Sequence, residues 1–215
     1  NVPEDMRSTS PLAENGLMDD YRGYLDAAGW TVLDDSNGLG GYFRAKDGEA
    51  FFSTQGLYIG DAEDINIFTS FAAQGLVAVG MDPEGKKTLA LTFRGTDDKD
   101  ALDAALGQAY TGNGIYNYYE AMRPLIDAAI GYANDDGNGI DKVVVSGHSL
   151  GGATVDLFTL VDAHRLQSDL DLTIVSLASA GLHPKAFLED YKKNGMAGQY
   201  DTNLVRSLDQ SLSND

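Results

Sequence analysis

A serine set among small residues, directly after a short valine run, is the side chain of this sequence best suited to covalent chemistry. Residues 143–145 are all valine, and Ser146-Gly147-His148-Ser149-Leu150-Gly151-Gly152 follows, with a glycine two positions before Ser149 and another two positions after it. This G-x-S-x-G spacing is typical of a nucleophile elbow, in which a strand turns sharply into a helix and glycines let the two pass closely. The sequence therefore predicts a strained backbone and a nucleophilic hydroxyl at Ser149.

A serine that attacks a carbonyl carbon depends on two other kinds of group. A base must take the hydroxyl proton, and hydrogen-bond donors must stabilise the tetrahedral oxyanion. The usual donors are the backbone N–H after the nucleophile, here that of Leu150, and an N–H from a loop that follows an earlier strand. Apolar residues at helical spacing predict a buried helix over residues 153–166, with its N-terminus towards the serine.

Strands alternate with helices along the chain, which indicates an α/β fold with a largely parallel sheet. The predicted strands are residues 30–33, 76–79, 89–93, 143–145, 172–178 (buried) and 203–208, and the predicted helices are residues 17–28, 64–73, 115–129 (kinked or restarted at Pro124) and 153–166. Residues 42–45 and 50–53 are expected to pair as a hairpin, and residues 82–85 to form a tight turn. Ligands bind beyond the carboxyl ends of such strands, where Ser149, Thr96 and Asp209 all stand.

Two motifs together resemble those of the class 3 lipases, a family of the α/β-hydrolase superfamily. They are GHSLGG at residues 147–152 and LTFRGT at residues 91–96, in the order in which that family has them. The resemblance extends from about residue 76 to about residue 210, and it implies an α/β-hydrolase fold with a mostly parallel central sheet flanked by helices. It also implies that the second oxyanion donor is the N–H of Thr96, the small hydroxyl residue after FRG.

The resemblance further implies a catalytic acid near the end of the chain. Asp209 follows a predicted strand and stands 60 residues after Ser149 (209 − 149), a spacing similar to that of class 3 lipases. Asp215 is the alternative, because Ser213-Asn214-Asp215 resembles the Asn-Asp that often begins the family's aspartate loop. We favour Asp209, although most acidic residues of any chain are simply solvated.

The base is harder to find, because none of the three histidines is well placed. His148 lies inside the elbow, and His164 lies on the predicted helix after the serine, roughly 20 Å away from it. His183 stands at the correct end of the sheet but precedes the acid, whereas α/β-hydrolases run serine, acid, histidine. We expect His183 to be structural or on the surface.

In class 3 lipases the histidine follows the aspartate by tens of residues. We therefore expect a missing C-terminal segment to supply it. On this interpretation residues 1–215 form a single lipase-like domain that is a fragment of a longer chain and lacks its C-terminal part.

Composition and charge limit the classes of partner that this chain can bind. With 15 Lys and Arg against 33 Asp and Glu, the net charge of −18 disfavours nucleic acid and anionic membranes, while neutral or zwitterionic lipid stays open. The absence of cysteine excludes disulfides, thiolate nucleophiles and cysteine metal sites. No apolar run approaches the roughly 20 residues of a membrane span, and the first residues show no signal-peptide pattern. An acidic, cysteine-free chain rich in Asp, Asn and Gly suggests a secreted bacterial protein.

Two further segments have more than one interpretation. Residues 134–141 carry oxygens suited to calcium but lack the spaced Asp and terminal Glu of an EF-hand loop, so we expect a plain turn and no metal. Residues 100–110 have an amphipathic pattern that fits either a core helix or a lid over the serine. The resemblance implies the lid, because class 3 lipases carry theirs there.

The sequence therefore predicts a serine esterase or lipase that hydrolyses carboxylic esters of acylglycerols or phospholipids through an acyl-enzyme on Ser149. No cofactor is expected, and contact with a lipid interface would be transient. The alternative is a catalytically idle lipase-like domain that binds lipid or a protein partner. The strained serine favours the enzyme, and the missing histidine favours the idle domain.

Overall fold

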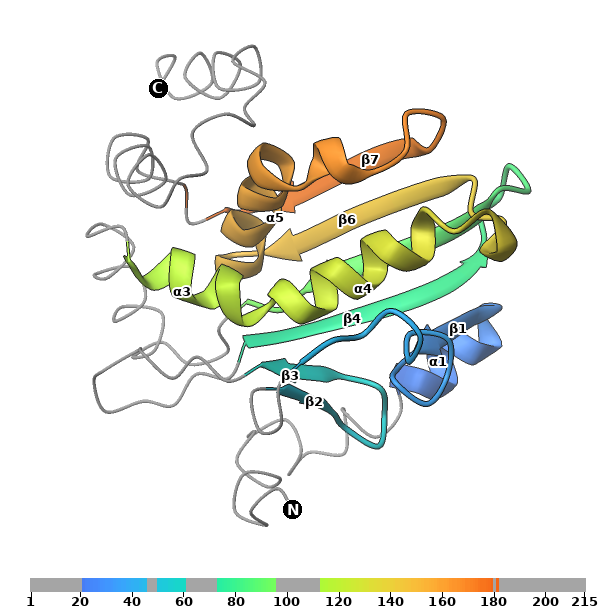
Figure 1. Cartoon of the computed structure of the whole chain (residues 1–215), viewed down its shortest axis with the longest axis horizontal. Helices are drawn as coiled ribbons and strands as arrows, with labels where there is room; N and C mark the ends of the chain where they lie inside the picture. Colours follow the sequence, from blue (N-terminus) through green and yellow to red (C-terminus); the bar gives the residue numbers. More distant parts are fainter. Residues whose placement is uncertain (1–20, 46–49, 61–72, 96–112, 180, 182–215) are drawn as a thin grey trace.

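The structure is a computed structural model that describes residues 21–45, 50–60, 73–95, 113–179 and 181. They form one sheet of order β2-β3-β4-β5-β6-β7, and β1 pairs with β4 on the edge that β3 also uses (Figure 1). The strands are β1 (Trp30–Leu33), β2 (Ala50–Phe52), β3 (Tyr58–Gly60), β4 (Ala73–Met81), β5 (Lys87–Phe93), β6 (Lys142–His148) and β7 (Asp171–Leu177). The α-helices are α1 (Tyr21–Ala27), α3 (Asn113–Ala121), α4 (Arg123–Ala133) and α5 (Leu150–Val161), and the 3-10 turns are η2 (Asp136–Asn138) and η3 (Ala163–Arg165).

The sheet changes from antiparallel to parallel at β5. The pairs β1–β4, β2–β3, β3–β4 and β4–β5 are antiparallel, whereas β5–β6 and β6–β7 are parallel. The carboxyl ends of β5, β6 and β7 therefore meet at one end of the sheet, where Ser149 follows β6; we call this the elbow end. The predicted α/β-hydrolase fold is confirmed, and its parallel strands are those that carry the elbow.

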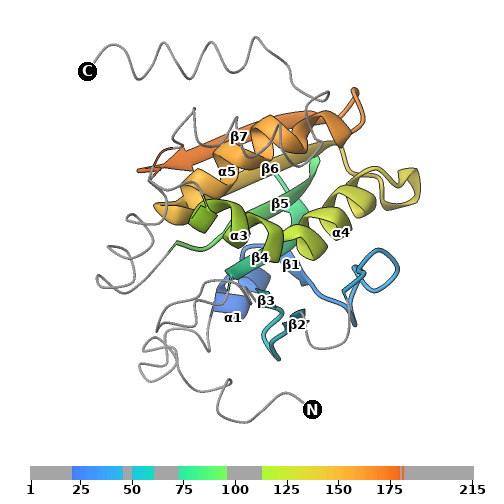
Figure 2. The ribbon, with the colours of Figure 1, turned by 60° about the vertical axis from the view of Figure 1, so that its left-hand side comes forward.

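One face of the sheet is covered by α3, α4 and α5 (Figure 2). The register pairs Leu89 of β5 with Val143 of β6, and Leu91 with Val145, so these four side chains point to the same face. All four are buried, and they belong to one core with the apolar residues of the helices. Burying such side chains stabilises a fold by about 1.5–3 kcal/mol each, so the core fixes the elbow strand firmly.

The apolar run over residues 115–129 is divided between two helices. Of the two predicted alternatives, a kink or a new helix at Pro124, the new helix is therefore correct. The break falls at Met122, and Pro124 occupies the first turn of α4. Proline has no N–H to donate to the carbonyl four residues earlier, so α3 cannot continue through it, but its fixed φ suits the start of a new helix. The backbone N–H of Ile126 then donates to the carbonyl of Met122 at 3.0 Å, the first bond of the new helix.

The predicted hairpin between residues 42–45 and 50–53 is wrong. β2 pairs with β3 instead, and residues 42–45 form no strand. The turn between β2 and β3 is closed by the Ser53 hydroxyl oxygen, which accepts from the N–H of Leu57 at 3.1 Å, and by Gly56 at a φ of 79°. A left-handed residue of this kind suits glycine, so the reversal occurs here.

Side-chain contacts determine where the segment before β2 lies. The ring of Phe43 meets Phe52 edge-on at a centroid distance of 5.0 Å and Tyr58 at 6.0 Å. The hydroxyl of Tyr42 donates to Asp135 Oδ2 at 2.5 Å. The Tyr42 bond ties this segment to the turn after α4, while Phe43 packs its side chain on β2 and β3, so tertiary packing overrides the local hairpin pattern.

Three further predictions need correction. Strand β7 forms as predicted, but it is not buried: Leu172 is 38% exposed and Leu177 55% exposed. The helix after the elbow begins at Leu150 and ends at Val161, so residues 163–165 belong to η3. Residue 73 is already in β4 and not in a helix. The other residues of the predicted helix 64–73, the lid segment 100–110 and the strand 203–208 lie outside the described residues.

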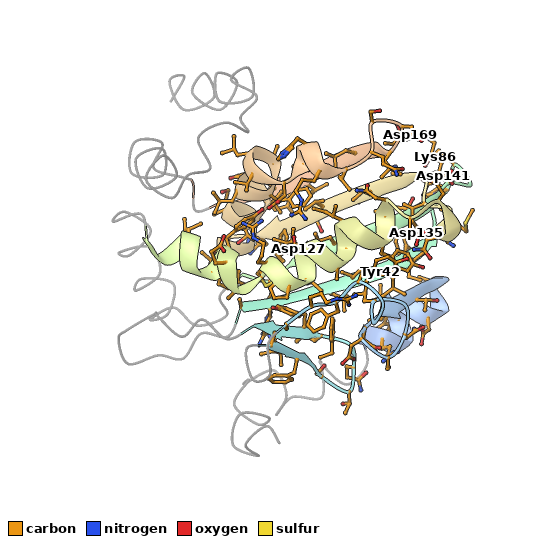
Figure 3. The ribbon with its side chains drawn as sticks, in the orientation of Figure 1. Tyr42, Lys86, Asp127, Asp135, Asp141 and Asp169 are labelled. Carbon is orange, nitrogen blue, oxygen red and sulfur yellow. The ribbon has the colours of Figure 1, made fainter. Side chains whose placement is uncertain are left out.

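The tight turn predicted at residues 82–85 is confirmed, with Gly85 at a φ of 80°. Asp82 closes it by accepting from the backbone N–H of Lys86 at 2.9 Å, and this bond holds the pKa of Asp82 below its usual value. Because the folded pKa is lowered, the stabilisation is present above the unfolded pKa of about 3.9 and is lost as the pH falls through the folded value. Figure 3 shows Lys86 and Asp141 at this end of the sheet, away from the elbow.

A buried carboxylate joins α3, α4 and η3. Asp162 is 2% exposed and accepts from the guanidinium of Arg123 at 2.6 Å, from that of Arg165 at 2.7 Å and from the hydroxyl of Tyr119. Arg123 also lies over the ring of Tyr119, 4.9 Å from its centroid. A carboxylate this deeply buried is stable only because it is paired and hydrogen-bonded, so the residue after α5 is fixed to the two helices before it.

We expect Asp162→Asn to lower the free energy of unfolding by about 3 kcal/mol, because it removes the charge that balances two guanidinium groups in the interior. Asp127→Asn is the matched control: Asp127 also accepts from Arg165, at 2.7 Å, but its side chain is 43% exposed. It should lose less than about 1 kcal/mol. Urea midpoints at constant m-value measure both. Equal losses would show that Asp162 matters no more than a surface pair.

Candidate active site

Ser149 lies in a strained turn between β6 and α5. Its φ is 56° and its ψ −119°, and Ala178 is the other non-glycine residue with positive φ among the described residues. A side chain in this region of backbone space costs free energy and persists only where the surrounding structure enforces it. The strained backbone predicted at Ser149 is therefore confirmed, and the turn has the geometry of a nucleophile elbow.

The glycines of the motif are required by contacts inside the elbow. A Cβ on Gly147 would lie 2.2 Å from the carbonyl oxygen of Gly151, so strand and helix pass each other at backbone distance. A Cβ on Gly151 would lie 2.3 Å from the carbonyl oxygen of Phe93, the last residue of β5. Real side chains never approach so closely, so any larger residue would displace the helix from the strand.

A third glycine, in the FRGT motif, brings the end of β5 against Ser149. A Cβ on Gly95 would lie 2.4 Å from the carbonyl oxygen of His148 and 3.2 Å from Cβ of Ser149. The structure therefore brings the two motifs together, although they are more than fifty residues apart (149 − 95 = 54). Thr96, the predicted second oxyanion donor, lies outside the described residues.

The first turn of α5 presents backbone N–H groups near Ser149. The first bond into the helix runs from the N–H of Ala153 to the carbonyl of Ser149 at 3.1 Å, so the N–H of Leu150 precedes the helical ladder and has no acceptor in it. The partial positive charge of a helix N-terminus adds to this donor. Leu150, the predicted oxyanion donor, is thus the first residue of α5, directly after Ser149.

The end of β7 is bonded directly to the elbow. The N–H of Ser149 donates to the carbonyl of Leu177 at 3.0 Å, and the Ser176 hydroxyl donates to the carbonyl of Gly152 at 3.2 Å. Ala178 then turns the chain with a φ of 44°. Sequence reasoning did not find this second strained turn, because alanine carries no signal for positive φ.

The segment after that turn is held to α5 by a further bond. The Ser179 hydroxyl donates to Asp156 Oδ2 at 2.6 Å and accepts from the N–H of Gly181 at 3.0 Å. Gly181 itself has a φ of 77°. The chain that leaves β7 is therefore fixed to α5, the helix that follows Ser149.

The end of β5 is fixed by a small hydrogen-bond network. The hydroxyl of Tyr118 donates to the carbonyl of Arg94 at 2.6 Å and accepts from the N–H of Gln74 at 3.2 Å. The Arg94 N–H donates to the carbonyl of Gln74 at 2.9 Å, and its guanidinium donates to the Gln74 side-chain oxygen. The sequence placed Tyr118 in a buried helix face, which is correct, but gave no sign of this role.

Neither histidine in the described part of the chain is bonded to Ser149. His148 ends β6 and is exposed, in register with Leu177 of β7. His164 is exposed in η3, past the far end of α5, and 12 helical residues span about 18 Å. His183 and both candidate acids, Asp209 and Asp215, lie outside the described residues.

The described residues contain no metal cluster. No group of three or more His, Asp or Glu side chains is placed there to hold an ion. In the turn after α4, the Asp135 side chain accepts from the hydroxyl of Tyr42 and from the N–H of Gly137 at 2.8 Å. Figure 3 shows Tyr42 beside Asp135.

No described helix is long and apolar enough to cross a membrane.

The comparisons with known proteins agree with the two motifs. The family model named "Lipase (class 3)" matches residues 83–207, more than half of the chain. The chain therefore belongs to the class 3 lipase family.

Among solved structures, the crystal structure of M37 lipase is similar at 14% sequence identity with a TM-score of 0.40, over 79% of this chain and 54% of that one. The chain thus spans about half the length of that lipase. No curated protein matches the sequence.

The strain at Ala178 can be tested by releasing it. Ala178→Gly should raise the free energy of unfolding by about 0.5–1 kcal/mol, because glycine adopts a positive φ without a steric cost. Gly139→Ala is the reverse control: Gly139 has a φ of 58°, and an added Cβ there would meet no atom within 4 Å. It should lose about 1 kcal/mol. Thermal and urea unfolding measure both changes, and a destabilised Ala178→Gly variant would contradict the strained turn.

Proposed function

We propose that this chain is the hydrolytic domain of a lipolytic enzyme in which Ser149 is the nucleophile. The observation that carries the proposal is the strained backbone of Ser149 at a glycine-lined elbow, between a parallel strand and a helix N-terminus. A strained non-glycine residue at such a position is a reason to infer function, since the fold must compensate for its cost. Membership of the class 3 lipase family supports the same reaction.

The proposed reaction has two halves. Ser149 Oγ attacks the carbonyl carbon of the ester while a base takes its proton, and the carbonyl oxygen becomes an oxyanion. Collapse of this intermediate breaks the ester bond, and the leaving alcohol receives the proton from the base. Water then attacks the acyl-enzyme in the same way, which releases the carboxylic acid and restores Ser149.

The elbow would stabilise the oxyanion through fixed donors. We assign one to the N–H of Leu150 and the other to the N–H of Thr96. The chain enters residue 96 from Gly95, which contacts the backbone of His148 and Cβ of Ser149. Donors already in place when charge develops need no reorganisation, and losing one typically lowers kcat by about 10² to 10³.

The base and acid are proposals from the family resemblance alone. We assign the acid to Asp209, with Asp215 as the alternative, and the base to a histidine supplied by a segment after residue 215. His183 is the other candidate base. The acid would orient the imidazole and stabilise its charged form.

The proposed substrates are carboxylic esters of acylglycerols or phospholipids. The net charge of −18 favours neutral or zwitterionic lipid over anionic surfaces. Residues 100–110 are the proposed lid that meets a lipid interface for the duration of a turnover. We also propose that the protein acts outside the cell.

A second candidate function is a catalytically idle domain that binds lipid or a protein. The observation that favours it is that, in the part of the chain that the structure describes, neither His148 nor His164 hydrogen-bonds Ser149. A fluorophosphonate separates the two functions, because it reacts with an activated serine and not with an idle one.

In the natural full-length protein, a fluorophosphonate should label Ser149 stoichiometrically, and Ser149→Ala should lower ester hydrolysis by about 10³ to 10⁶. Ser146→Ala is the matched control: its hydroxyl lies on the same strand, 2.9 Å from that of Thr92. It should keep turnover within about threefold, because the lost bond contributes about 1 kcal/mol to stability only. Retention of more than about a tenth of turnover by Ser149→Ala, or no labelling, would reject the enzyme.

A further inference from the structure

Tyr118 of α3 reaches from the helix layer to the strand end beside the nucleophile. It is 4% exposed, and its hydroxyl donates to the carbonyl of Arg94 at 2.6 Å, one residue past the end of β5. The same hydroxyl oxygen accepts from the N–H of Gln74 at 3.2 Å. One oxygen atom thus links three elements at the elbow end of the sheet.

The partners of Tyr118 are also bonded to each other. The N–H of Arg94 donates to the carbonyl of Gln74, which extends the pairing of β4 and β5 by one bond beyond its last register pair. The Arg94 guanidinium donates to the side-chain oxygen of Gln74. Arg94 is therefore held at its backbone N–H, at its carbonyl and through its side chain.

The residue after this peptide touches the nucleophile. Gly95 lies so close to the elbow that a Cβ would be 3.2 Å from Cβ of Ser149. A peptide group is planar, so a bond that fixes the carbonyl of Arg94 also fixes the N–H of Gly95. Glycine is otherwise free to rotate, so the place of Gly95 against the elbow depends on how firmly the preceding peptide is held.

We propose that Tyr118 is a positioning residue for the oxyanion hole: its hydroxyl, with Gln74, holds the Arg94–Gly95 peptide against the elbow, at the point from which the chain continues to the proposed donor Thr96. This inference rests on the proposed function. Oxyanion donors must lie within about 2.7–3.1 Å of the developing charge, and a displacement of about 1 Å can lower a rate by about 10². Tyr118 acts through the backbone and does not touch the substrate.

Tyr118→Phe tests the role, because it removes the hydroxyl and keeps the ring. In the natural full-length protein we expect kcat for p-nitrophenyl butyrate to fall by about 10- to 100-fold with KM within about twofold, since the lost interaction forms in the transition state. Inhibition by an aliphatic trifluoromethyl ketone, which forms an anionic hemiketal on Ser149, should weaken by the same factor. A substrate-binding role would instead raise KM.

Tyr58→Phe is the matched control. Tyr58 is fully buried, and its hydroxyl donates to the carbonyl of Ala121 at 2.6 Å, a bond of the same kind to the last residue of α3 and not to the strand end beside Ser149. Both variants should lower the urea midpoint by similar amounts, but Tyr58→Phe should keep kcat within about twofold. Equal losses of kcat in the two variants, or a rise in KM with kcat unchanged, would overturn the proposal.

Two further variants, Gln74→Met and Ser149→Ala, keep the positioning role testable. If Tyr118→Phe does not fold, Gln74→Met removes the side-chain acceptor of Arg94 from the opposite side and should lower kcat at least about fivefold at constant KM; an unchanged kcat overturns the proposal. Ser149→Ala separates this inference from the proposed function. If Ser149→Ala is inactive and Tyr118→Phe matches Tyr58→Phe, only the positioning role fails.

Discussion

Contact between backbones, with no side chain in between, is the constraint on which the site depends. At Gly147, Gly151 and Gly95 an added Cβ would lie within 2.4 Å of a carbonyl oxygen. Three segments therefore meet at distances that only glycine permits: the end of β5, the end of β6 and the first turn of α5. Close packing of this kind leaves no room for adjustment, so the strain at Ser149 cannot relax into a neighbouring space. The rest of the molecule keeps these segments in place: the core under α3, α4 and α5 fixes the strands, and Asp162 fixes the helices.

Much of this arrangement could be predicted from the sequence, because it depends on local signals. The valine run, the glycines around Ser149 and the Asp82 turn each carry their own pattern, and β1, β5, β6 and the elbow form where those patterns lie. The hairpin of residues 42–45 with β2 could not be excluded, because its failure depends on tertiary contacts such as the hydrogen bond from Tyr42 to Asp135, 93 residues further along the chain. The exposure of β7 was missed for a similar reason: an apolar run indicates a strand but does not say whether another layer covers it.

In the candidate site, the residues of the motif could be predicted from the sequence, but the residues that support them could not. The motif predicts Ser149 and Leu150, and the strained backbone of Ser149 is as expected. The catalytic roles of both residues stay predictions. The supporting residues do not follow from it, because Tyr118 looks like any core tyrosine and Ala178 like any alanine. Their roles depend on hydrogen bonds across more than twenty residues of sequence, such as that from Tyr118 to Arg94 (118 − 94 = 24), and no single-sequence pattern encodes such a pairing. The acids and the base remain predictions from the family resemblance.

The bond from the N–H of Ser149 to the carbonyl of Leu177 couples the local stability of the elbow to that of β7. β7 is the outermost parallel strand of the described sheet, and Leu177 is 55% exposed. Exposed outer elements open locally at a lower free energy than the core, without global unfolding. Each such opening of β7 would release the amide of Ser149, so hydrogen exchange at Ser149 follows the local stability of β7 and not that of the valine-rich strand that precedes the serine. A strained residue in the described part of the chain thus depends on an exposed strand.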